Sequence, residues 1–93
     1  FNATSAEDRA GLAALAGATG TTWASRDLAC TSYWEPKPGE RCVGSALDHL
    51  LVGGAPRRVT AAGPCQTEGC GERQACPLFH RRVSDHCPVV ADL

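Results

Sequence analysis

The sequence predicts an α+β fold, in which one helix is followed by several short strands. Two observations favour it: a helix-capping pattern near the start, and later runs of β-branched and aromatic residues separated by glycine and proline. The 93 residues are 43% hydrophobic and 20% charged, a balance typical of a globular chain rather than a disordered one. Its apolar side chains are mostly small, so the core that this chain can build by itself is thin.

The first segment predicts an amphipathic surface helix. Thr4 and Glu7 have the spacing of a capping box. Apolar residues then recur at helical offsets as far as Ala16, and we expect Gly17 and Gly20 to end the helix.

Short strands are expected after the helix, over residues 21–23, 31–34, 46–52, 57–61 and 86–93. The segment 63–82 contains several prolines and glycines and has no apolar period, so it predicts a loop. These strands have too little apolar side chain to cover both faces of a sheet. We therefore expect residues 1–93 to be the C-terminal portion of a single larger domain whose N-terminal portion is absent from this chain.

Charge and hydropathy exclude several classes of protein. Nine basic and ten acidic residues give a formal net charge of -1, so no overall basic field is available to bind a phosphate backbone non-specifically. No apolar run approaches the roughly 18 residues of a membrane span, and we expect none. No signal-peptide pattern is visible.

Six cysteines in a short chain predict a disulfide framework and an exported protein, either extracellular or periplasmic. They are Cys30, Cys42, Cys65, Cys70, Cys76 and Cys87. We expect Cys30 to pair with Cys42, because the two bracket a Pro/Gly turn over residues 35–39.

Two alternatives concern the other cysteines. Cys65, Cys70 and Cys76 with His80 could form a Cys₃His zinc site, although their spacings are looser than those of zinc motifs. The alternative for Cys87 is a free thiol, which would also pack on the strand expected there.

Two aspartate–histidine pairs are the candidate chemical groups. Asp48 lies within the apolar run 46–52, where a carboxylate needs a partner, and a histidine is a natural one. An aspartate held against an imidazole fixes its tautomer and supports its protonated form. The alternative is that each aspartate merely caps a strand end. His49 points to the face opposite Asp48 on an alternating strand, so we expect it to be structural.

Three signals in order along the chain resemble the last third of the endonuclease/exonuclease/phosphatase superfamily. They are Phe1-Asn2, the strand Leu47-Asp48-His49-Leu50, and Ser84-Asp85-His86-Cys87-Pro88-Val89. The superfamily includes pancreatic-type deoxyribonucleases, apurinic-site endonucleases, neutral sphingomyelinases and inositol polyphosphate phosphatases. The resemblance implies a four-layered α/β sandwich of two packed mixed or antiparallel sheets.

The resemblance also implies roles for individual residues. His86 matches the histidine that contacts the scissile phosphate, and Asp48 matches the carboxylate that orients it. Asp85 matches a residue near the metal or the attacking water, and Asn2 matches an asparagine that positions the nucleophile. The implied cofactor is Mg²⁺ or Mn²⁺, with Ca²⁺ as a further candidate, since hard oxygen ligands suit these ions.

The family's remaining catalytic groups lie upstream of Phe1. The resemblance therefore implies that an N-terminal portion of the same enzyme is the partner of this chain, and that the chain alone is inactive.

A locally basic stretch precedes the Ser-Asp-His motif. Arg81, Arg82 and His80, with Arg73, could hold substrate phosphates, and a solvated loop is the equal alternative. The aromatic residues Trp23, Tyr33 and Trp34 are expected in the core rather than as base-stacking platforms.

The function that these observations favour is metal-dependent hydrolysis of a phosphodiester by a secreted nuclease. The alternatives are a sphingomyelinase or other phosphatase of the same superfamily, and a non-catalytic secreted disulfide-rich binding module. The enzyme hypothesis requires the side chains of Asp48 and His86 to lie within hydrogen-bonding distance of each other.

Overall fold

The computed structural model describes residues 5–37 and 39–93, with Arg81 described by its backbone alone. In this part of the chain the elements, in order, are α1 (Ala6–Thr19), β1 (Thr22–Trp23), β2 (Ser32–Trp34), β3 (Val43–Ser45), β4 (Leu51–Val52), β5 (Arg58–Ala61), α2 (Pro64–Thr67), α3 (Leu78–Arg82) and β6 (Val89–Asp92). The strands pair antiparallel as β1–β4, β2–β3 and β5–β6. This combination of helices and small antiparallel sheets confirms the α+β class.

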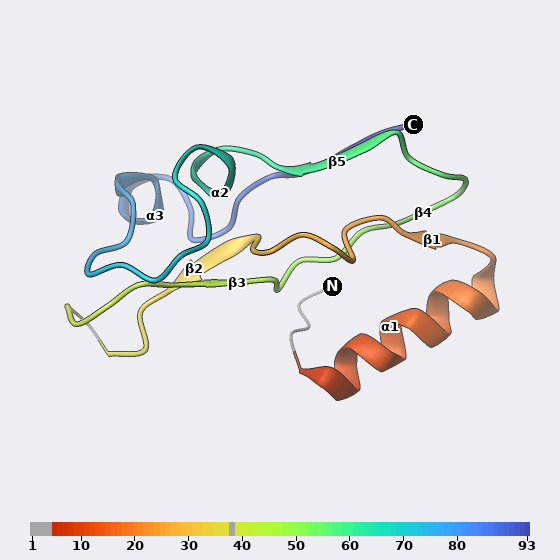
Figure 1. The fold of residues 1–93 in the computed structure, drawn as a ribbon, viewed down its shortest axis with the longest axis horizontal. Coiled ribbons are helices and arrows are strands. Elements are labelled where there is room, and N and C mark those ends of the chain that lie inside the picture. Colours follow the sequence, from red (N-terminus) through yellow and green to blue (C-terminus); the bar gives the residue numbers. More distant parts are fainter. Residues whose placement is uncertain (1–4, 38) are drawn as a thin grey trace.

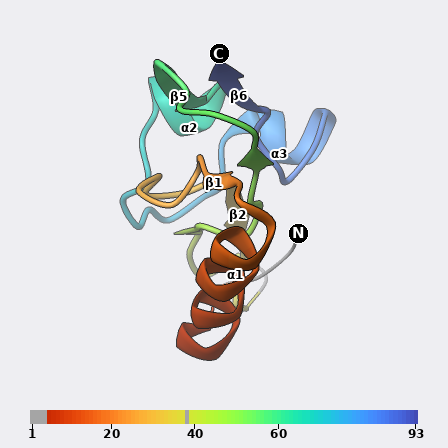
Figure 2. The ribbon, with the colours of Figure 1, turned by 90° about the vertical axis from the view of Figure 1, so that its right-hand side faces the viewer.

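The described part of the chain is elongated, with extents of 42 × 27 × 18 Å. Helix α1 lies at one end, and the short helices α2 and α3 lie at the other (Figure 1). The view along the long axis shows α1 projecting away from the C-terminal strands (Figure 2). None of the described helices is long and apolar enough to span a membrane.

Helix α1 is capped by Ser5, whose side chain accepts a hydrogen bond from the backbone N–H of Asp8 at 3.1 Å. The predicted cap, Thr4, was wrong as the start of the helix and lies outside the described residues. The helix also continues through Gly17, since one interior glycine costs only about 1 kcal/mol. It ends at Gly20, which has a φ of 68° and donates its N–H to the carbonyl of Ala16.

The strand predicted over residues 46–52 is largely wrong. Only Leu51–Val52 is a strand, and β3, which was not predicted, precedes it. The reason is a contact with a distant segment: the backbone N–H groups of Leu47 and Asp48 donate to the hydroxyl of Thr31, at 3.0 and 2.9 Å, instead of joining a strand ladder. The segment predicted as a loop, 63–82, likewise contains the short helices α2 and α3.

Strand β2 has neighbours on both sides. Its pairing with β3 places Ser32 opposite Ser45. On the other side Ser32 forms an antiparallel bridge with His86, the N–H of Tyr33 donates to the carbonyl of Asp85 at 2.8 Å, and the N–H of Cys87 donates to the carbonyl of the residue before Ser32 at 2.7 Å. The segments that carry Asp48 and His86 therefore lie on opposite sides of the same strand.

Three disulfides join the chain, Cys30–Cys70, Cys42–Cys76 and Cys65–Cys87. Together with Tyr33 and Ala61, four of these half-cystines form the larger buried cluster: Cys30, Cys42, Cys65 and Cys87. Disulfide sulfurs thus supply much of the core that the small apolar side chains cannot.

The predicted Cys30–Cys42 bridge was wrong. The β2–β3 register places Trp34 opposite Val43, so along the same ladder Cys42 falls opposite residue 35 rather than opposite Cys30. The zinc alternative was also wrong, because Cys65, Cys70 and Cys76 are all disulfide-bonded. Cys87 is not a free thiol, since it pairs with Cys65.

Candidate active site around Asp48 and His86

The structure brings the side chains of Asp48 and His86 together. Asp48 Oδ2 lies 2.6 Å from Nδ1 of His86, although the two residues are 38 positions apart. A carboxylate oxygen accepts, so Nδ1 donates and Asp48 selects the orientation of the ring. The side chain of His86 is 34% exposed, and its second nitrogen, Nε2, is the atom available to a ligand.

Thr31 holds the carboxylate of Asp48 in place. Its hydroxyl donates to Asp48 Oδ2 at 3.0 Å while accepting the backbone N–H groups of Leu47 and Asp48. Thr31 is 0% exposed, so these bonds are screened little by water. The sequence contains no signal for this role, because a threonine beside a cysteine matches no motif.

The backbone of His86 is fixed as well. Its N–H donates to Oγ of Ser84 at 3.0 Å, a local turn that orients the histidine. Asp85 Oδ1 lies 3.9 Å from His86 Nε2, so a second carboxylate flanks the nitrogen that faces solvent. The arrangement can donate a hydrogen bond to an anion from an oriented imidazole.

Among the described side chains, no hydrogen bond or ion pair joins Arg73, His80 or Arg82 to this pair. Arg82 is exposed on α3, while the side chain of Arg81 is not described. Arg73 is bound to Glu68, with its Nη1 3.1 Å from the carboxylate, and does not present a free guanidinium. His80 is half-buried, and its Nδ1 is buried without a hydrogen-bond partner.

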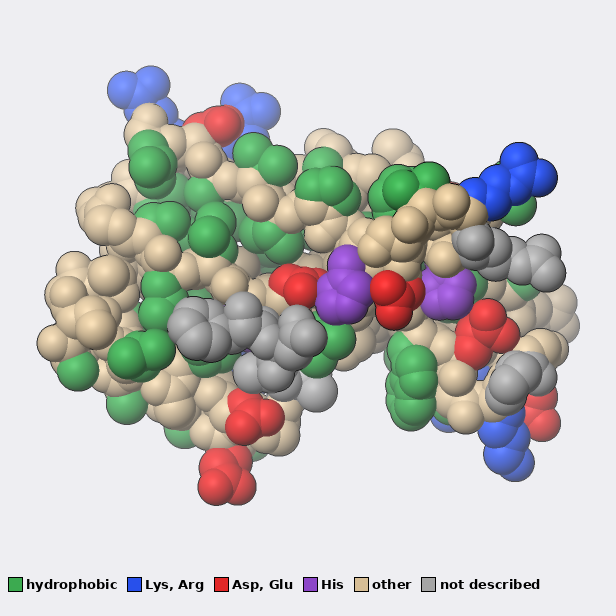
Figure 3. Space-filling view, turned by 180° about the vertical axis from the view of Figure 1, so that it is seen from behind, with side chains coloured by type: hydrophobic (Ala, Val, Ile, Leu, Met, Phe, Trp, Pro, Cys, Tyr) green, Lys and Arg blue, Asp and Glu red, His purple; other side chains and the backbone are tan. Residues whose placement is uncertain are grey.

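Asn2 lies outside the described residues. Its predicted role in positioning the nucleophile therefore stays a prediction. On the face of the molecule shown in Figure 3, histidine and acidic side chains form one row above a notch in the outline.

The aromatic residues divide between two environments. Trp23 and Tyr33 are buried, as predicted, whereas Trp34 is 61% exposed and its predicted place in the core was wrong. The alternation of side chains along β2 explains the difference, because Tyr33 points into the disulfide core and its neighbour Trp34 points to the other face. The indole N–H of Trp23 donates to Nδ1 of His49 at 3.1 Å, and His49 is buried, in keeping with the structural role expected for it.

Burial raises the pKa of the Tyr33 hydroxyl above its ordinary value of 10.0. The nearby charge of Arg73 lowers this pKa and that of Glu68 raises it, and burial is the largest effect. The hydroxyl lies 2.9 Å from the carbonyl oxygen of Pro64 and 2.5 Å from that of Gly69. Tyr33 therefore stays protonated and ties β2 to the loop that carries α2.

The described residues do not assemble a Mg²⁺ site by themselves. The cluster of possible ligands found among them is Glu35, Cys76 and His80, whose ligand atoms lie within 4.8 Å of one another. Cys76 is held in a disulfide and cannot act as a thiolate ligand. Asp85 stands outside this cluster, as a single carboxylate beside His86.

Comparison with known proteins adds no family to this geometry. No family model, no curated protein and no solved structure matches the chain.

Proposed function

We propose that the chain contributes the Asp48–His86 pair to an active site that hydrolyses phosphodiesters, as part of a secreted nuclease. The observation that supports the proposal is the 2.6 Å contact between Asp48 Oδ2 and His86 Nδ1. An isolated surface histidine would not carry an orienting carboxylate that itself accepts a hydrogen bond from the buried hydroxyl of Thr31. That hydroxyl also accepts the backbone N–H groups of Leu47 and Asp48, which fixes the segment of the carboxylate.

In this proposal His86 donates a hydrogen bond from Nε2 to a non-bridging phosphate oxygen, where negative charge grows as water attacks. Asp48 supports the protonated imidazole and, by holding Nδ1, leaves Nε2 to face the phosphate. Asp85, whose Oδ1 lies 3.9 Å from Nε2, would act on the metal or the attacking water, the role that the resemblance implies for it.

The divalent cation of the proposed reaction, Mg²⁺ or Mn²⁺, would stabilise charge on the leaving oxygen. Since the described residues do not form its site, we propose that an N-terminal portion of the same enzyme supplies the other ligands. Export is the proposed setting: three disulfides are typical of extracellular proteins, where thiols are oxidised.

The test is hydrolysis of single-stranded DNA, RNA and sphingomyelin by the chain combined with that N-terminal portion, in Mg²⁺ or Mn²⁺. We expect nucleic acid to be cleaved. His86→Ala should lower kcat by roughly 10²–10⁴, the usual contribution of a positioned proton donor. Asp48→Asn should lower kcat less, because the ring keeps its place but loses its carboxylate partner.

The matched control is Asp27→Asn, which removes an exposed carboxylate elsewhere and should leave kcat unchanged. Full activity of His86→Ala, with an unaltered unfolding midpoint, would contradict the proposal. Cleavage of sphingomyelin alone would keep the site and replace the nuclease assignment by a lipid phosphodiesterase.

A further inference from the structure

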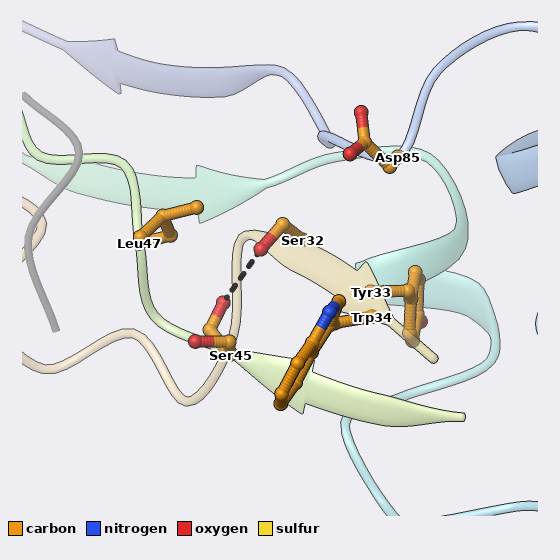
Figure 4. Close-up of a pocket in the computed structure, with 6 residues that line it drawn as sticks. All are labelled: Ser32, Tyr33, Trp34, Ser45, Leu47 and Asp85. Carbon is orange, nitrogen blue, oxygen red and sulfur yellow. Dashed lines mark hydrogen bonds between the residues drawn. The ribbon is translucent and has the colours of Figure 1, made fainter. Parts of the chain in front are cut away.

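A cavity of about 280 Å³ lies next to the Asp48–His86 pair. It is lined by Ser32, Tyr33, Trp34, Ser45, Leu47 and Asp85 (Figure 4). Leu47 precedes Asp48 and Asp85 precedes His86, so both halves of the pair are one residue away from the cavity wall. The cavity therefore lies beside the two segments that carry the pair.

The β2–β3 hairpin builds one wall. Side chains alternate along β2, so Ser32 and Trp34 share the face that Tyr33 does not. Ser32 donates from its hydroxyl to the carbonyl of Ser45 across the hairpin at 3.3 Å, which closes the inner end (Figure 4). The indole of Trp34 stands at the open end, where it is 61% exposed.

The lining is unsuited to a phosphate. It contains no lysine, arginine or histidine, and its one charged group is the carboxylate of Asp85, which repels anions. It is suited to an uncharged planar group, because the flat face of Trp34 can stack on a ring while Leu47 supplies apolar contact. The volume falls just under the usual range for small-molecule sites, so it has room for one such ring system rather than for a base pair.

We propose that this cavity binds the base of the nucleotide whose phosphate contacts His86, with Trp34 as its stacking platform. This inference rests on the proposed nuclease function and adds to it the recognition of a single unpaired base. Stacking on an aromatic side chain is tolerant of sequence, because every base presents a π-face. The cavity therefore selects single-stranded over double-stranded nucleic acid without reading its sequence.

The test compares two probes that differ only by the base, adenosine 5′-monophosphate and ribose 5-phosphate. Each is titrated into the oxidised chain, and binding is followed by the indole Nε1–H resonances in ¹H–¹⁵N spectra. The chain has two tryptophans, and Trp23 is an internal control because its indole is buried and bonded to His49. We expect the nucleotide to shift the Trp34 resonance, to leave Trp23 in place, and to bind roughly tenfold more tightly than the sugar phosphate, within the usual range for one stacked base.

Two variants sharpen the result. Trp34→Ala should bind both probes equally, whereas Trp34→Phe should keep part of the preference for the nucleotide. Equal binding of the two probes by the unmodified chain, or an unchanged preference in Trp34→Ala, would overturn the inference.

A failure of the proposed function has a different signature. Ribose 5-phosphate should shift the ring resonances of His86, and His86→Ala should weaken its binding. If His86 does not respond while Trp34 still responds to the nucleotide, the base cavity stands as a ligand site and the phosphodiesterase proposal falls. If His86 responds to both probes and Trp34 to neither, the base cavity falls and the phosphate site stands.

Discussion

Replacing Thr31 by valine tests the physical basis of the site. The two side chains are both β-branched and of similar size, so the change removes the hydroxyl without opening a large cavity. The hydroxyl makes three hydrogen bonds, of 2.9 to 3.0 Å, to the backbone of Leu47 and to the backbone and carboxylate of Asp48. At about 1 kcal/mol each, reduced slightly because the partners are only partly buried, the predicted loss is roughly 2–3 kcal/mol in the free energy of unfolding.

The measurement is urea unfolding of the oxidised chain at neutral pH, together with the Nδ1–H proton resonance of His86. We expect Thr31→Val to lower the midpoint and to broaden or lose that resonance through exchange with water, because Asp48 is no longer held against the ring. Thr31→Ser is the matched control: it keeps the hydroxyl and should cost only about 1 kcal/mol for the lost methyl group.

The reasoning would be refuted if the free energy of unfolding of Thr31→Val lay within about 0.5 kcal/mol of that of the unmodified chain, because surface substitutions with no structural effect vary by that amount. It would also be refuted if Thr31→Ser were as damaging as Thr31→Val, since the methyl group would then matter more than the hydroxyl.

Three further predictions concern stability. Gly44→Ala should lower the free energy of unfolding by about 1–3 kcal/mol, because a Cβ there would lie 2.8 Å from the carbonyl oxygen of residue 70. Gly17→Ala, on an open face of α1, should instead raise the free energy of unfolding by about 0.5–1 kcal/mol, and thermal unfolding measures both changes. Removing the Cys65–Cys87 bridge, which spans 22 residues, by changing both to alanine should cost about 3 kcal/mol in urea unfolding; no loss would mean that the bridge is absent in solution. Burial raises the pKa of Tyr33 in the folded state, so its contribution to stability is complete below pH 10.0 and is lost as pH rises through the folded pKa. Tyr33→Phe should therefore reduce the fall in the free energy of unfolding at alkaline pH. An identical fall in the variant would exclude Tyr33 as its cause.

The helix and the approximate positions of most strands could be predicted from residue types, because those signals are local. Capping and alternation act within a few residues. The strand run 46–52 was mispredicted for a non-local reason: its ladder hydrogen bonds are replaced by bonds to the hydroxyl of Thr31, 16 and 17 residues away. The disulfide pairing was mispredicted for the same kind of reason, since the β2–β3 register decides which cysteines can meet.

Within the candidate site, Asp48 and His86 could be identified in advance because each stands in a recognisable sequence context. Trp34 could not be separated from Tyr33 by composition. Both are aromatic residues of one short strand, and only the direction of alternation relative to the disulfide core decides which is buried. The cavity beside Trp34 depends on the side to which this residue points, so residue types alone could not have predicted it.

Two half-cystines are direct neighbours in the sequence of residues that build the site, so the disulfides hold the site in place. Cys30 precedes Thr31, and Cys87 follows His86, while the N–H of Cys87 donates to the carbonyl of Thr31 at 2.7 Å. Both half-cystines belong to the buried cluster, so Thr31, which bonds to Asp48, and His86 are each anchored in the core one residue away. A chain with few large apolar side chains could not otherwise hold a 2.6 Å contact between distant segments, because the entropy of ordering them would have to be offset by a core that it lacks. The cross-links that led us to expect an exported protein also help to fix, in the folded structure, the geometry of the candidate active site.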